Sequence, residues 1–300
     1  MYVATKGVLK TLLVKTMIKA ASAFGAAFFI FTPFNAVAED APGPSVQRII
    51  HEAENLSLNR DRNLACGVLW RNIKRADKTD AKILRDKLFQ LSRYYYTDKG
   101  FQASVVGKEL FQKQKYQDAA DKLAEADDLE AGNVEVLHFL TLSKLWLKKF
   151  SQAETVNRRA LQICPIDMDL QRDLLAVAIS QERWPEALTT AETLNKEYND
   201  YSAQTLQSMG VALFKRDMKA EAKKALEQAL AKDPHLPETY YWLASLKDDK
   251  DSLKFLTKYM ELCKNKSQPG QLTNVPTGAS SEREIYFCSH LPEVEKKVGS

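Results

Sequence analysis

The stretch KYQDAADKLAEA, residues 115–126, has a counterpart thirty-four residues later in KFSQAETVNRRA, residues 149–160. The positions they share are an aromatic residue and two alanines: Tyr116 and Phe150, Ala119 and Ala153, and Ala126 and Ala160. The charged residues between these positions differ. A helix that keeps one aromatic and two small residues at fixed offsets indicates a repeated packing unit.

The same marks continue along the chain at intervals of 34 or 35 residues. Proline at positions 165 and 234 falls where a unit should end, because proline cannot continue a helix. The further positions that keep the interval are large aromatic, alanine or glycine residues: Trp184, Ala187, Ala222, Ala229, Gly107 and Gly210. The chain therefore predicts an array of about five helical units.

These repeated residues resemble the tetratricopeptide repeat (TPR), a family of antiparallel helix pairs. The resemblance implies an all-α fold, an α-solenoid of stacked pairs in a right-handed superhelix. It places Gly107 and Gly210 where the two helices of a pair cross, together with the repeated alanines. It places Tyr116, Phe150 and Trp184 between neighbouring units. Lys219 stands where a fourth aromatic is expected.

We expect the array to cover residues 100–265, with a divergent helical block at 45–97 before it. That block carries apolar stripes of helical period but lies out of phase with the repeat. We expect it to stack on the first repeat as an N-terminal cap, since an uncapped end exposes an apolar face. Residues 266–300 are predicted to be a linker and a C-terminal tail.

The first 38 residues are typical of an export signal. They hold Lys6, Lys10, Lys15 and Lys19 and no acidic residue, followed by an apolar run and by Ala36-Val37-Ala38. We expect cleavage after Ala38 and export to a bacterial periplasm. The alternative is an uncleaved membrane anchor, which is the only way in which we expect the chain to contact a membrane.

Charge and motifs exclude several classes of function. The four lysines of residues 1–38 account for the whole net charge of +4, so the remainder carries equal numbers of basic and acidic side chains. A neutral chain without a basic run offers little to a phosphate backbone, and we expect no nucleic-acid partner. The sequence predicts no enzyme, cofactor or metal site: its four histidines are scattered, and no phosphate-binding loop or nucleophile motif is present.

The resemblance implies that the first helix of each unit lines a concave groove that holds a protein partner. Carried over by position, the predicted groove residues are Phe101, Lys108, Phe111, His138, Leu145, Arg172, Gln207, Phe214 and Tyr241. The aromatic residues among them can instead be packing between repeats. The lysine and asparagine clamp by which some members hold a C-terminal carboxylate is missing.

Our leading interpretation is a non-catalytic periplasmic scaffold that binds another cell-envelope protein through its groove. The alternative is a regulatory or accessory subunit of an envelope enzyme, with residues 45–97 as the effector part.

The four cysteines can form pairs in an oxidising compartment. Stacked helix spacings of roughly 8–10 Å predict that Cys66 and Cys164 lie over about 20 Å apart, as buried free thiols. We expect a disulfide between Cys263 and Cys288, which would fix the C-terminal residues over the end of the array. The alternative is a tail without a bridge.

Overall fold

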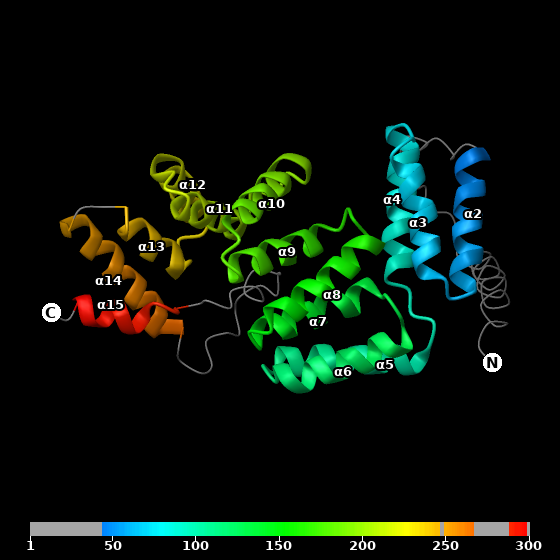
Figure 1. Ribbon diagram of the computed structural model, residues 1–300, viewed down its shortest axis with the longest axis horizontal. Coiled ribbons are helices and arrows are strands. Elements are labelled where there is room, and N and C mark those ends of the chain that lie inside the picture. Colours follow the sequence, from blue (N-terminus) through cyan, green and yellow to red (C-terminus); the bar gives the residue numbers. More distant parts are fainter. Residues whose placement is uncertain (1–43, 247–248, 267–287, 299–300) are drawn as a thin grey trace, which may run out of the picture. The chain divides into compact units, whose positions relative to one another are not determined.

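The computed structural model describes residues 44–246, 249–266 and 288–298 (Figure 1). The expected signal peptide, most of the linker and residues 285–287 lie outside these ranges. All regular elements within the described ranges are helices, and they belong to one compact unit, Pro42–Ser300.

Residues 98–266 form five antiparallel helix pairs. Each second helix packs against the first helix of the next pair, so the pairs are stacked in chain order. The pairs are α5 (Asp98–Gln112) with α6 (Tyr116–Leu129), α7 (Val134–Trp146) with α8 (Phe150–Ile163), α9 (Met168–Ser180) with α10 (Trp184–Glu197), α11 (Ala203–Lys215) with α12 (Lys219–Lys232), and α13 (Pro237–Ala244) with α14 (Asp249–Lys266). The predicted all-α solenoid of helix pairs is confirmed.

Helix starts and turns repeat with the packing residues. The side chains of Thr97, Asn133, Asp167 and Ser202 each accept a hydrogen bond from a backbone N–H and cap the first helices of four pairs. Within the same pairs, the turn between the two helices contains a non-glycine residue in the left-handed region: Gln114, Lys148, Glu182 and Asp217, with φ of 57–60°. A left-handed residue ends a helix by satisfying its last carbonyl groups, so each pair turns in the same way.

Small residues sit where helices cross. A Cβ atom added to Gly107 would lie 2.7 Å from Cγ of Leu123 in α6, and one added to Gly210 would lie 2.6 Å from Cγ of Leu226 in α12. The backbones therefore approach closely only because these side chains are absent. The alanines of the repeat pattern are all fully buried: Ala119, Ala126, Ala153, Ala160, Ala187, Ala222 and Ala229.

The repeated aromatics contact neighbouring units. The ring of Tyr116 stacks on Trp146 of the next pair at 5.0 Å between centroids, and Phe150 packs against the same core. Trp184 lies under the ammonium group of Lys215, which belongs to the following pair, at 5.6 Å. These contacts lie between units, as the TPR resemblance implies.

The N-terminal block consists of α2 (Pro44–Leu58), α3 (Arg62–Ile73) and α4 (Lys78–Ser92). Helix α3 packs on α8 of the second pair, and the shared core joins Leu69, Leu84 and Leu88 to Leu137 and Ile163. The block therefore packs against the second pair and also contacts the predicted first repeat at Glu130 and Ala131.

A fully buried arginine fixes this position. Nη1 of Arg62 donates to the carbonyl oxygens of Glu130 at 2.6 Å and Ala131 at 2.7 Å, and Nη2 donates to that of Tyr94 at 2.5 Å. The Glu130 carboxylate, also fully buried, lies 3.4 Å from Nη2. It also accepts hydrogen bonds from the backbone N–H groups of Tyr96 and Thr97. We call Arg62 and Glu130 the N-terminal latch.

The two free cysteines lie closer together than expected. Cys66 and Cys164 belong to the same core, because α3 packs on α8, so the prediction of a wide separation is wrong. That prediction assumed a block stacked in line with the repeats. Both thiols are buried, and burial raises the pKa of each to about 12.

The C-terminal residues include a helix that the sequence reading did not predict. Helix α15 (Leu291–Val298) packs on α14, and Val294 is buried in a small core with Leu256 and Tyr259. Cys288 forms a disulfide with Cys263, with 5.7 Å between their Cα atoms. The end of the array is therefore closed by α15.

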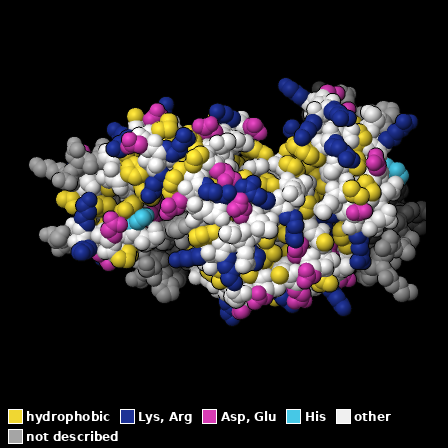
Figure 2. All heavy atoms as spheres, in the orientation of Figure 1, with side chains coloured by type: hydrophobic (Ala, Val, Ile, Leu, Met, Phe, Trp, Pro, Cys, Tyr) yellow, Lys and Arg dark blue, Asp and Glu magenta, His cyan; other side chains and the backbone are white. Residues whose placement is uncertain are grey.

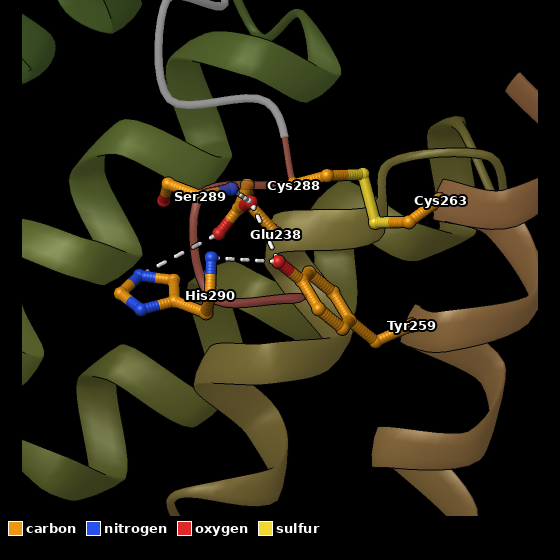
Figure 3. The surroundings of a disulfide bond; sticks show 6 residues. All are labelled: Glu238, Tyr259, Cys263, Cys288, Ser289 and His290. Atoms are coloured by element: carbon orange, nitrogen blue, oxygen red, sulfur yellow. Dashed lines mark hydrogen bonds and ion pairs between the residues drawn. A yellow bond between two sulfur atoms is a disulfide. The ribbon is translucent and has the colours of Figure 1, made fainter. Parts of the chain in front are cut away.

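Polar contacts surround the disulfide (Figure 3). The hydroxyl of Tyr259 donates to Oε1 of Glu238 at 3.3 Å and accepts from the backbone N–H of His290 at 3.0 Å. The N–H of Ser289 donates to the same oxygen of Glu238 at 3.2 Å. Residues 288–290 are thus bonded to both α13 and α14.

Candidate partner-binding face

The predicted groove residues lie on the first helices of the five pairs, but two of them are not accessible. Phe111 is 5% exposed and Leu145 is fully buried, and both belong to the core between the first two pairs. Their assignment to a groove is wrong, because those positions face the next pair. Phe101 is 43% exposed.

Four polar residues of the predicted groove connect successive pairs. Lys108 donates to Glu135 at 2.8 Å, and Nδ1 of His138 lies 2.6 Å from Oδ2 of Asp173. Arg172 donates to Asp200, and Gln207 accepts a hydrogen bond from Thr239 at 2.6 Å. Each contact joins one pair to the next pair or to the loop before it. We call these contacts the inter-repeat ladder.

The strongest rung of the ladder is bidentate. Nε and Nη2 of Arg172 each donate to one oxygen of Asp200 at 2.9 Å. Burial alone would raise the pKa of Asp200, but hydrogen bonds from Arg172, Thr205 and Ser202 outweigh it and lower that pKa to about 2. The pKa of Glu135 is also lowered. Burial alone would raise it, but the hydrogen bonds from Lys108 and Tyr95 outweigh this effect. These rungs stabilise the stack, so they are poor targets for testing binding alone.

The last three pairs carry a cluster of aromatic residues. The ring of Phe214 in α11 lies 5.3 Å from that of Trp242 in α13, and Tyr241 stacks on His290 at 3.8 Å. The ammonium group of the exposed Lys215 lies 5.1 Å from the ring centroid of Trp242 and 5.6 Å from that of Trp184. We call Trp184, Phe214, Lys215, Tyr241 and Trp242 the aromatic platform.

Sequence reasoning found only part of this platform. Phe214 and Tyr241 were predicted by position, and Trp184 was predicted as packing. Lys215 and Trp242 were missed, although each directly follows a predicted residue. Burial lowers the pKa of His290, the Glu293 charge opposes this, and Lys215 adds to the decrease, so the imidazole beside the platform favours its neutral form.

The surface carries charges of both signs. Figure 2 shows basic and acidic side chains interspersed with separate hydrophobic patches on one face. Within the described ranges, no three His, Cys, Asp or Glu residues are grouped so that they could hold a metal ion. No helix in the part of the chain described here combines the length and apolar character needed to cross a membrane.

Comparisons with known proteins show that this chain is similar in structure to several solved proteins. No family model matches the sequence, and no curated protein matches it either. Solved structures similar to this chain include MamA from Desulfovibrio magneticus RS-1, with a TM-score of 0.49, 19% identity, and coverage of 57% of this chain and 99% of that one. YrrB, a TPR protein with an unusual peptide-binding site, has a TM-score of 0.43, 17% identity, and coverage of 57% of this chain and 87% of its own. The chain is a solenoid of TPR-like helix pairs, as its own period and helix packing show.

Proposed function

We propose that this chain is a non-catalytic scaffold of the bacterial periplasm that binds another cell-envelope protein through the first helices of its pairs. The observation that carries the proposal is the aromatic platform. Phe214, Tyr241 and Trp242 are only partly buried, and Lys215 is exposed beside them. Aromatic residues with a nearby cation supply contact area at low entropic cost, which suits a protein interface.

A rigid array also favours binding without reorganisation. The ladder and the buried crossings hold the first helices in place before a partner arrives, so little ordering entropy is lost on association. The partly exposed aromatic rings would then supply most of the buried apolar area.

Two features support export. The lysine-bearing, apolar start and Ala36-Val37-Ala38 fit a cleaved signal. The Cys263–Cys288 disulfide suits an oxidising compartment. Intact-mass measurement of the native protein should give a chain that starts at Glu39. A membrane-bound species that keeps residues 20–38 would indicate an anchor.

A role as an accessory subunit of an envelope enzyme is favoured by the N-terminal block. Leu58 and Leu64 are exposed on it at 77% and 54%, away from the array core. A second partner would contact this block, and removing its leucines would weaken capture of that partner alone.

The binding proposal is tested by capture from periplasmic and membrane fractions, with mass identification. Wild type should retain one protein that Lys215→Glu loses, while Lys224→Glu, an exposed change on α12, should retain it. Because both lysines are exposed, the melting temperatures should stay close to wild type. Equal retention by all three chains would contradict the platform as the binding site.

A further inference from the structure

The first helix pair carries an open groove that is lined by residues of α5 and α6. Ala103 and Val106 of α5 and Leu129 of α6 form its apolar part, and the groove has a volume of about 570 Å³. Its remaining lining is polar and mostly charged: Asp98, Lys99, Gln102, Lys122, Glu125 and Asp128. Val106 is 40% exposed and Leu129 is 38% exposed.

The equivalent positions of the second pair show what such a groove requires. One period after Val106 and Leu129 stand Leu140 and Ile163, each only 4% exposed. Leu140 packs in the core shared with the first pair, and Ile163 packs in the core shared with the N-terminal block. Among the residues that the structure describes, none gives Val106 and Leu129 such cover, because α3 packs on α8 instead. Within these residues, the groove of the first pair is therefore an open end of the array.

The opposite end of the array is closed. Helix α15 packs on α14 and is held there by the Cys263–Cys288 disulfide. A second copy therefore cannot continue the array by placing its open end on an exposed last pair. Two copies can instead meet through their open ends, which gives a closed dimer with two-fold symmetry.

The charges around the groove suit this arrangement. Lys99 and Lys122 accompany three carboxylates in the lining. A two-fold axis brings the surface of one copy against the same surface of the other, so basic groups of one copy can meet acidic groups of its partner. A surface with charges of one sign only would instead repel the same surface of a second copy.

We propose that the groove formed by α5 and α6 is the interface of a homodimer in which two copies meet open end to open end. Val106 and Leu129 of each copy are buried there against the same residues of the other. This inference is independent of the proposed partner on the aromatic platform.

Sedimentation equilibrium of the purified chain over a wide concentration range tests the proposal. Wild type should show a reversible monomer–dimer equilibrium. Val106→Glu places a carboxylate from each copy in the apolar part and should weaken the dimer at least tenfold. Leu253→Glu, at a residue 46% exposed on α14, is the matched control and should leave the dissociation constant unchanged.

Several results would overturn the proposal. These are a wild-type chain that stays monomeric throughout, a Val106→Glu dimer of unchanged affinity, or a dimer weakened only by Leu253→Glu. Circular dichroism and the melting temperature of Val106→Glu should match wild type, because the residue is already exposed. If that variant unfolds, oxidation of Leu129→Cys decides: it should give cross-linked dimers, and Leu253→Cys should not.

Discussion

The two ends of the array are held by opposite kinds of interaction. The N-terminal block is joined to the array by the latch, in which Arg62 and Glu130 are buried ions surrounded by backbone carbonyl and N–H groups. The C-terminal helix α15 is joined by a covalent bond and a small apolar core. The latch depends on every polar partner being present, whereas the disulfide depends on redox conditions. Loss of either should act at its own end, because repeats interact mainly with their neighbours.

The largest effect should come from breaking the latch. Arg62→Ala leaves the Glu130 carboxylate and several carbonyl groups buried with fewer partners, which should cost roughly 3–5 kcal/mol of unfolding free energy. Urea unfolding followed by circular dichroism measures this cost. Arg158→Ala removes an arginine that is half exposed and ion-paired at the surface, and should cost below about 1 kcal/mol. Similar losses in both variants would show that the latch is not the main N-terminal junction.

Breaking the disulfide should cause the second largest loss of stability. The bridge closes a separation of 25 residues, and the chain-entropy model gives it about 3 kcal/mol. Cys263→Ser should therefore lower the melting temperature and increase protease cleavage before α15. A reductant should lower the melting temperature of wild type by the same amount and leave Cys263→Ser unchanged. A further decrease in the reduced variant would place the redox effect elsewhere.

The Arg172–Asp200 contact in the middle of the inter-repeat ladder should contribute less to stability than the disulfide does. The pKa of Asp200 is about 2, against an ordinary 3.8, so its charged form is favoured in the folded chain. The stabilisation is complete above the ordinary pKa and is lost as the pH falls through about 2. Asp200→Asn should cost about 2 kcal/mol at pH 7.

Unfolding free energies of wild type and Asp200→Asn, measured from pH 7 down to pH 2, check this sign. Their difference should stay constant to about pH 4 and shrink below it. A difference that grows on acidification would rule out Arg172–Asp200 as its source.

Changes at the buried helix crossings, with an effect of similar size, test the repeat packing itself. Ala119→Leu or Ala153→Leu inserts a larger side chain at a fully buried crossing and should cost roughly 1–3 kcal/mol. Asp121→Ala, at an exposed position of the same helix as Ala119, should change stability by less than about 0.5 kcal/mol. Equal effects from all three changes would contradict the assignment of the packing positions.

The repeat could be predicted because it is local and periodic. The alanine position of Ala119 recurs in four pairs, and the aromatic position of Tyr116 recurs until Lys219, so their spacing predicts where the helices pack. The capping residues and the left-handed turn residues also recur in the structure. The turn residues are Gln, Lys, Glu and Asp, and these residue types do not by themselves indicate a left-handed backbone conformation. The helix α15 had a weaker signal, since Leu291, Val294 and Val298 follow a helical period after a region of linker composition.

The junctions could not be predicted, because they depend on contacts between distant residues. Arg62 is one charged residue at the start of a helix, and nothing near it in sequence indicates full burial against residues 68 and 69 positions later. The prediction that Cys66 and Cys164 lie far apart was wrong for the same reason. In the candidate site, position alone identified Lys108 and Arg172 but not their use in joining pairs, which depends on Glu135 and Asp200.

Hydrogen exchange read by mass spectrometry tests most directly whether the two ends are held independently. Reduction of wild type should accelerate exchange in α15 and α14 and leave α2–α4 unchanged. Arg62→Ala should accelerate exchange in α2–α4 and at residues 130–133 while leaving α15 unchanged. If either perturbation loosened both ends together, the array would act as one cooperative block, and the account of two separate junctions would be wrong.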